Sequence, residues 1–178
     1  ATKYYESGEA MFPDMLAALE SAEHFIFLEY FIIEEGHMFH QIEDILEKKV
    51  KEGVEVRLIY DDVGCIGTLP PRYYKQLQKK GIKCAAFNPF RPLLSVIMNN
   101  RDHRKIFVVD GAVGFTGGIN LADEYINEVK RFGYWKDTGV RIEGEAVWSL
   151  TSMFLSMWNY IVHSTEDYSR FMPAQHQK

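Results

Sequence analysis

The chain lacks the features that mark several large classes of protein. It has two cysteines, Cys65 and Cys84, in 178 residues. That is too few for a disulfide framework and fits a reducing compartment. It has no uncharged apolar run of about 18 residues, because Glu29 interrupts the longest apolar stretch, so we expect the chain as given to be soluble. Residues 1–15 lack the pattern of a signal peptide, and Ala1 in place of methionine indicates a processed, truncated or excised piece.

An excess of positive charge is also missing. The net charge of −5 gives no general attraction to nucleic acid or anionic lipid, so any anion site must be local. The 47% hydrophobic and 14% aromatic content excludes disorder and suffices for one core. We therefore predict a single domain over residues 1–165, followed by a frayed tail at 166–178.

The hydrophobic pattern predicts an α/β fold. In the first half, strand patterns at 24–33, 54–62 and 82–87 alternate with helix patterns at 11–23, 38–53 and 70–81. This order implies parallel strands with right-handed crossovers. In the second half, the pattern predicts a hairpin at 103–120, a helical segment at 121–127, a strand at 134–144 and a helix at 145–162.

The hairpin carries the most informative stretch, RDHRKIFVVDGAVGFTGGIN, at 101–120. A strand over HRKIFVVD places His103 and Lys105 on one face, because side chains alternate with a period of two. The Asp110-Gly111 pair is a strong signal for a hairpin turn. Antiparallel pairing from that turn brings residues 117–120 opposite His103.

These residues suit the handling of a phosphoryl group. Gly117 and Gly118 let an anion approach backbone N–H groups, and Lys105 supplies a neutralising charge. The imidazole of His103 is suited to nucleophilic or proton-transfer chemistry near neutral pH. Taken singly, a strand histidine is usually structural, a lysine solvated and a glycine pair a turn; their combination favours a site.

The stretch HRKIFVVD matches the H-x-K-x-x-x-x-D signature of the phospholipase D superfamily, and Gly117, Gly118 and Asn120 match its glycine pair and asparagine. The chain most resembles the first catalytic domain of bacterial cardiolipin synthases. The similar pieces are FIFLEYFI, KKVKEGVEVRLIYDDVGC, GGINLADEY, YWKDTGVRIEGEAV and FLSMWNY. The resemblance implies a phospholipase D-like mixed β-sheet flanked by helices, with the motif on a central hairpin.

The resemblance also implies a ping-pong phosphatidyl transfer without metal or cofactor. His103 would be the nucleophile, Lys105 and Asn120 would bind phosphoryl oxygens together with Gly117 and Gly118, and Asp137 would orient the imidazole. Asp110 completes the motif of catalytic residues, but by parity it faces away from His103, so we expect it to shape the motif. The implied substrate is phosphatidylglycerol or a related phospholipid, and the implied location is the bacterial cytoplasmic membrane, with the catalytic domain in the cytosol or at the membrane surface.

The site is incomplete within this chain, because the superfamily builds an active site from two motifs and only His103 begins one here. A second motif would come from another domain of a longer protein or from a homodimer partner. The alternatives are a homodimeric phosphodiesterase or nuclease and an inactive anion-binding half-domain. The net charge of −5 mildly disfavours nucleic acid as a substrate.

Three further features are open to more than one interpretation. Glu29 lies in an apolar strand and forms either a part of the site or a structural ion pair. Asp61 and Asp62 end a strand, where helix capping is favoured over a metal pair. Residues 90–98, FRPLLSVIM, either contact the bilayer or pack against protein.

Overall fold

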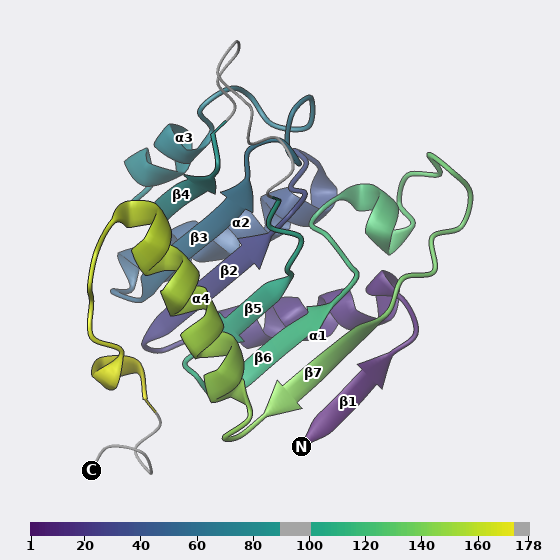
Figure 1. The fold of residues 1–178 in the computed structure, drawn as a ribbon. Coiled ribbons are helices and arrows are strands. Elements are labelled where there is room, and N and C mark those ends of the chain that lie inside the picture. Colours follow the sequence, from purple (N-terminus) through teal and green to yellow (C-terminus); the bar gives the residue numbers. More distant parts are fainter. Residues whose placement is uncertain (90–100, 173–178) are drawn as a thin grey trace.

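The computed structural model describes residues 1–89 and 101–172, which form a seven-stranded mixed sheet with helices on both faces (Figure 1). The strand order is β1-β7-β6-β5-β2-β3-β4. Strands β2, β3 and β4 are parallel, and the other neighbours pair antiparallel. The strands are β1 (Thr2–Tyr5), β2 (Phe25–Tyr30), β3 (Glu55–Asp61), β4 (Lys83–Phe87), β5 (Ile106–Val109), β6 (Val113–Gly117) and β7 (Gly139–Glu143).

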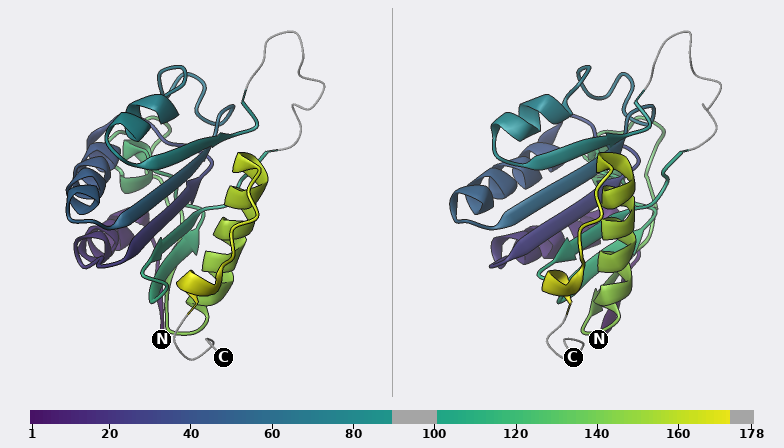
Figure 2. Two further views of the ribbon diagram at one scale, coloured as in Figure 1. Left: turned by 90° about the vertical axis from the view of Figure 1, so that its left-hand side faces the viewer. Right: turned by 60° about the vertical axis from the view of Figure 1, so that its left-hand side comes forward.

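The helices form two unequal layers around the sheet. Figure 2 shows α4 on one face and α1, α2 and α3 on the other. The helices are α1 (Gly8–Glu20), α2 (His37–Lys51), α3 (Tyr74–Lys79) and α4 (Val147–Val162), with the 3₁₀ segments η1 (Asp123–Ile126) and η2 (Ser169–Phe171). No helix among the described residues is long and apolar enough to cross a membrane.

The alternation of side chains in the central strands divides the core between the two faces. In β5, Phe107 and Val109 join the larger cluster beneath α1 and α2, whereas Ile106 and Val108 join the cluster beneath α4. All four residues are buried, because both faces of this strand are covered. Strand β5 therefore occupies the middle of the sheet, and the residues that precede it lie at a fully supported strand end.

The predicted fold class is confirmed: the sheet is mixed, helices flank it, and the motif lies at the central hairpin. The elements differ from the predictions at several boundaries. Strand β1 was not predicted and pairs with β7, which begins at Gly139 instead of residue 134. The helix predicted at 70–81 is shorter, over Tyr74–Lys79, and that predicted at 121–127 is the 3₁₀ segment η1.

The predicted fraying of the C-terminal tail is wrong for residues 166–172. Phe171 is 4% exposed and packs edge-on against Phe25, with ring centroids 5.0 Å apart. Glu166 forms two hydrogen bonds, of 2.6 and 2.9 Å, with the guanidinium of Arg57, which is 2% exposed. A buried guanidinium needs a paired carboxylate, and this requirement ties the tail to the sheet. The predicted lipid-contacting segment 90–98 lies outside the described residues.

Candidate active site

The hairpin of β5 and β6 forms the frame of the site. Asp110 and Gly111 have φ angles of 53° and 63°, as a type I′ turn requires, and the N–H of Ala112 donates to the carbonyl of Val109 at 3.0 Å. Pairing of Ile106 with Thr116 places Lys105 next to the end of β6. The hydroxyl of Thr116 donates to the carbonyl of Lys105 at 2.8 Å, which fixes that residue just before the strand.

Lys105 and His103 form the chemical centre of the site. The ammonium Nζ of Lys105 lies 3.0 Å from Nδ1 and 3.3 Å from Nε2 of His103, and donates to the His103 carbonyl at 2.7 Å. Lys105 is 4% exposed, whereas His103 is exposed. Burial lowers the pKa of Lys105, and the negative charges of Asp137 and Asp102 oppose that shift. The pair therefore presents a nucleophilic ring to solvent with a fixed positive charge against it.

Phe31 supports this pair and was not predicted from the sequence. Its ring centroid lies 4.7 Å from that of His103 and 5.5 Å from Nζ of Lys105. The residue follows β2 directly, at the end of a continuous apolar run. Nothing in that run distinguishes it from the core phenylalanines before it, so the sequence carries no signal for its role.

Asp137 enters the site beside the glycine pair. Gly118 leaves room for it, since a Cβ at this position would lie 2.0 Å from Oδ1 of Asp137. The same Oδ1 accepts a hydrogen bond of 2.8 Å from the N–H of Thr138. In the described part of the chain, no hydrogen bond joins Asp137 to His103. The negative charge of Asp137 instead acts on Lys105, whose pKa it raises.

Asn120 and Gly118, two of the residues predicted to bind phosphate, make hydrogen bonds within the fold. Asn120 is 2% exposed; its Oδ1 accepts from the N–H of Ile32 at 3.0 Å, and its Nδ2 donates to the hydroxyl of Tyr125 at 2.9 Å. The N–H of Gly118 donates to the carbonyl of Thr138 at 3.0 Å. These hydrogen bonds satisfy buried polar groups within the fold, and the binding of phosphate by Asn120 and Gly118 stays a prediction. Tyr125 is a second residue that sequence reasoning missed.

Asp110 lies at the opposite end of β5 from His103, and the structure does not bring the two together. Its carboxylate accepts hydrogen bonds of 2.8, 2.8 and 2.7 Å from the N–H groups of Glu23, His24 and Phe25. It thus joins the hairpin turn to the start of β2. A role of Asp110 in shaping the motif stays a prediction.

Glu29 lies next to the site and is buried among charged side chains. Its Oε1 lies 2.7 Å from Nε of Arg104, which also donates to Oδ1 of Asp102 at 3.0 Å. Asp61 is likewise buried and accepts from the N–H groups of Gly64 and Asp102, each at 2.9 Å, so it caps backbone groups. Among the described residues, no group of three or more His, Cys, Asp or Glu side chains could hold a metal ion.

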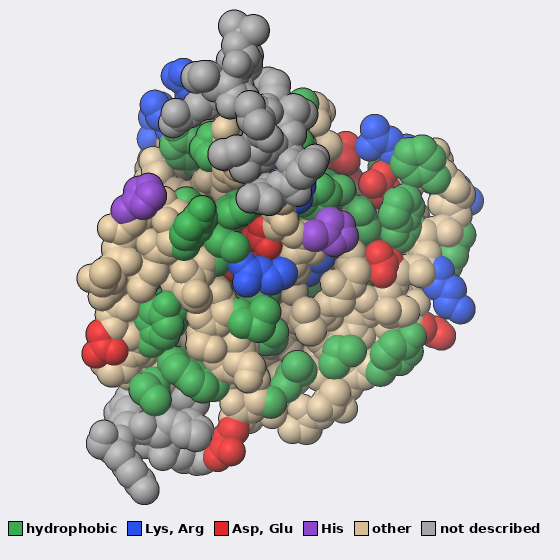
Figure 3. Space-filling model, in the orientation of Figure 1, with side chains coloured by type: hydrophobic (Ala, Val, Ile, Leu, Met, Phe, Trp, Pro, Cys, Tyr) green, Lys and Arg blue, Asp and Glu red, His purple; other side chains and the backbone are tan. Residues whose placement is uncertain are grey.

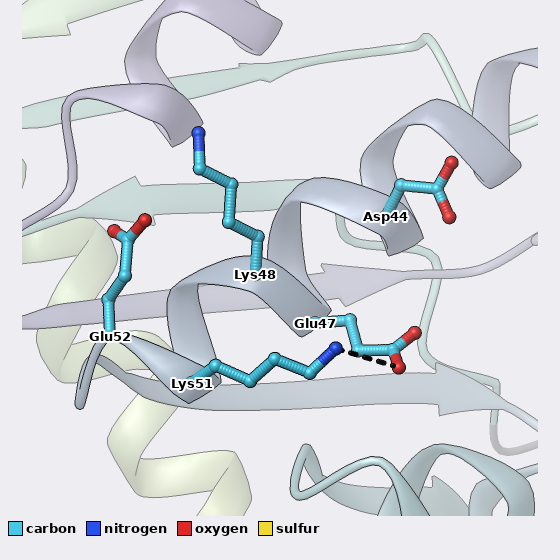
Figure 4. A pocket seen from close by; sticks show the side chains of 5 residues that line it. All are labelled: Asp44, Glu47, Lys48, Lys51 and Glu52. Carbon is cyan, nitrogen blue, oxygen red and sulfur yellow. Dashed lines mark ion pairs between the residues drawn. The ribbon is translucent and has the colours of Figure 1, made fainter.

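Figure 3 shows Lys or Arg, Asp or Glu and His side chains close together near the centre of the face in view. A hollow on α2 is different in kind: Asp44, Glu47, Lys48, Lys51 and Glu52 line it, and Lys51 pairs with Glu47 at 3.6 Å (Figure 4). Such a solvated helix surface has no convergent groups and no nucleophile.

Known proteins match most of the chain. A family described as "Cardiolipin synthase, PLD-like domain" matches residues 15–158. An uncharacterized protein of Streptococcus mutans is 56% identical over 156 residues, which are 88% of this chain and 34% of that protein. A cardiolipin synthase of Alkalihalophilus pseudofirmus is 44% identical over 160 residues, which are 89% of this chain and 32% of that enzyme. The chain therefore spans about a third of the length of these relatives.

One solved structure has the same fold over nearly the whole length of this chain. Nuc from Salmonella typhimurium, a phospholipase D family member, superposes with a TM-score of 0.64 at 20% identity, covering 94% of this chain and 97% of that one. At that identity the likeness shows the fold alone. The fold thus occurs both in a chain of similar size and as about a third of longer proteins.

Proposed function

The chain belongs to the phospholipase D-like domain family of cardiolipin synthases, and from this premise we propose that it is one half of a phosphatidyltransferase active site. The proposed substrate is phosphatidylglycerol, which serves as donor and acceptor and yields cardiolipin and glycerol. Residues 1–165 form the domain in this proposal, and a second H-x-K-x-x-x-x-D motif, from another domain or a second copy, completes the site. A phospholipid substrate places the site at the surface of the bacterial cytoplasmic membrane.

The observation that carries the proposal is the contact of the exposed His103 ring with the buried Lys105 ammonium, at 3.0 and 3.3 Å. The ammonium places a positive charge beside the ring that would attack phosphorus. A phosphoryl group attacked by that ring would bring its oxygens beside the same ammonium. A fixed positive charge at this point stabilises negative charge that develops in the transition state, and does so best where burial excludes water.

In the first half-reaction, a ring nitrogen of His103 attacks the phosphorus of phosphatidylglycerol. A nitrogen–phosphorus bond forms, the bond from phosphorus to the glycerol oxygen breaks, and the histidine of the second motif gives its proton to the leaving glycerol. In the second, a hydroxyl of another phosphatidylglycerol attacks the same phosphorus and gives its proton back to the second histidine. The nitrogen–phosphorus bond breaks, which releases cardiolipin and restores both histidines.

The other site residues have supporting parts in this proposal. Asp137 holds the imidazole of His103 in one tautomer once substrate closes the site, as the aspartate of a catalytic triad does. Asn120 and Gly118 bind phosphoryl oxygens only if they exchange the internal hydrogen bonds that now satisfy them. Lys105 is the principal phosphate ligand in this proposal, because its ammonium already contacts the ring that attacks phosphorus.

A transfer assay with the complete protein tests the proposal. His103→Ala should abolish the formation of cardiolipin from phosphatidylglycerol, and Lys105→Ala should lower kcat by about 10²–10³-fold. His40→Ala is a matched control, because His40 is an exposed histidine on α2, and it should leave the rate unchanged. Near-normal transfer by the His103→Ala protein would contradict the proposal.

The second candidate is a homodimeric phosphodiesterase that cleaves nucleic acid. The observation in its favour is the coverage of 97% of Nuc, whose chain is of similar size. The net charge of −5 does not favour a polyanionic substrate. The same assay with a nucleic-acid diester decides between them: turnover of the diester by the dimer, without turnover of phosphatidylglycerol, would support the second candidate.

A further inference from the structure

Two buried carboxyl groups and one partly exposed guanidinium form a cluster around the residues that flank His103. Glu29 on β2 is 0% exposed, and Asp102 is 5% exposed. Arg104 lies between them, with Nε at 2.7 Å from Oε1 of Glu29 and at 3.0 Å from Oδ1 of Asp102. His103 stands between Asp102 and Arg104 in the chain; it is exposed, whereas Asp102 is buried and the side chain of Arg104 is 32% exposed.

The cluster leaves several polar atoms without a hydrogen bond. The Nε–H of Arg104 is directed to Asp102, and no hydrogen bond is made by Oε1 and Oε2 of Glu29, Oδ2 of Asp102 or Nη2 of Arg104. If both carboxyl groups were ionised, two negative charges would face one guanidinium. A proton on Glu29 would let that carboxyl donate to Asp102. One carboxylate and one guanidinium would remain, and their charges would balance.

The surroundings of Glu29 favour the protonated form. Burial raises the pKa of Glu29 to about 9, the charge of Asp102 adds to the shift, and Arg104 opposes it. From β3, the nearest acid is Asp61, which is directed to the N–H groups of Asp102 and Gly64 and to Arg101. The rest of this face, from β3, β5 and α4, is the apolar cluster that includes Ile59, Ile106 and Phe154.

We propose that Glu29 is a protonated positioning residue: it donates a hydrogen bond to Asp102 and, through Asp102 and Arg104, holds residues 101–105 so that His103 remains aimed at the phosphoryl group. The inference rests on the proposed role of His103 as nucleophile. Two hydrogen bonds restrain the backbone on either side of His103. The N–H of Asp102 donates to Asp61 at 2.9 Å, and the N–H of Arg104 donates to Oδ1 of Asp102 at 3.3 Å. Both neighbours of His103 are thereby fixed.

The first test measures the proton itself and needs no substrate. ¹³C NMR of the chain with labelled glutamate carboxyls should show one carboxyl that titrates near pH 9. Glu29→Gln should remove that resonance, and Glu43→Gln should not. Glu43 is a matched control, because it is 6% exposed and ion-paired with Lys80 at 3.0 Å, on α2. If no carboxyl titrates near pH 9, the inference is overturned and the proposed function is not affected.

The second test measures positioning in the complete protein. Glu29→Gln keeps the shape and a neutral donor, so kcat should stay within about threefold of wild type, and the activity profile should lose an inflection near pH 9. Glu29→Ala should lower kcat by about 10–100-fold with KM nearly unchanged, because misplaced catalytic groups cost rate. Lys105 titrates in both proteins, so the difference between the profiles isolates Glu29. A loss in Glu29→Gln as large as that in Glu29→Ala would overturn the inference, and normal turnover by His103→Ala would instead overturn the proposed function.

Discussion

Replacing Asp110 with alanine should destabilise the fold and leave the chemistry intact. Three backbone N–H groups lose a charged acceptor at 2.7–2.8 Å. The N–H groups of Glu23 and His24 lie in an exposed part of the chain, where water replaces the carboxylate, whereas the N–H of Phe25 is partly buried and remains unpaired. Alanine at a φ of 53° adds strain that aspartate tolerates better.

The expected loss in the free energy of unfolding can be built from these parts. The Phe25 N–H costs about 1–2 kcal/mol, the two exposed bonds together about 1 kcal/mol, and the backbone strain about 1 kcal/mol. The sum is about 3–4 kcal/mol, and for a domain of this size each kcal/mol lowers Tm by roughly 2–4 °C. Asp110→Ala should therefore melt about 10 °C below wild type. Asp110→Asn, which keeps an acceptor oxygen and tolerates the positive φ, should lose about half as much.

Thermal unfolding followed by circular dichroism measures the first effect, and transfer activity well below both melting midpoints measures the second. We expect kcat of the Asp110→Ala protein to stay within about threefold of wild type, because Asp110 lies at the end of β5 away from His103. If the Asp110→Ala protein melts like wild type but loses more than about 100-fold in kcat, Asp110 acts on the reaction and not on the fold.

Three other substitutions test separate parts of the account. Gly118→Ala should lower kcat by about 10–100-fold with little change in Tm, because its Cβ would lie 2.0 Å from Asp137 and displace that carboxylate; transfer kinetics with a melting curve check this. Asn120→Ala should destabilise the domain by about 2–4 kcal/mol in urea unfolding, since the N–H of Ile32 and the hydroxyl of Tyr125 lose their partner. The raised pKa of Glu29, about 9, means that the folded chain keeps a proton that the unfolded chain releases above the ordinary value of 4.5. Relative to Glu29→Gln, wild-type stability should thus fall as pH rises through this interval, by up to about 1.4 kcal/mol per unit, and then level off; urea unfolding at several pH values checks the slope.

Much of the frame of the site could be predicted from the sequence, because local rules determine it. The Asp110-Gly111 turn and the period of two in the flanking strand give the hairpin register, which brings Lys105 to the end of β6. Phe31 could not be predicted as part of the site. Its sequence neighbours are core residues, and only the sheet order brings the end of β2 beside His103.

The same limit applies to groups whose partners are distant in the chain. In the sequence, Arg57 is a single polar residue in a strand pattern. In the structure it is buried and pairs with Glu166, which holds the C-terminal tail against the sheet. Asn120 belongs to the family motif, but its hydrogen bonds with Ile32 and Tyr125 depend on tertiary contacts. A charged residue in an apolar strand predicts that its side chain has a buried partner. The identity of that partner depends on tertiary contacts.

Mass spectrometry of a covalent intermediate tests the central claim most directly. The complete protein is mixed with phosphatidylglycerol, digested without acid, and searched for a phosphatidyl group on histidine. We expect this adduct on the peptide that contains His103, and its absence in the His103→Ala protein. An adduct on another residue, or release of glycerol in a single turnover without any adduct, would contradict the claim.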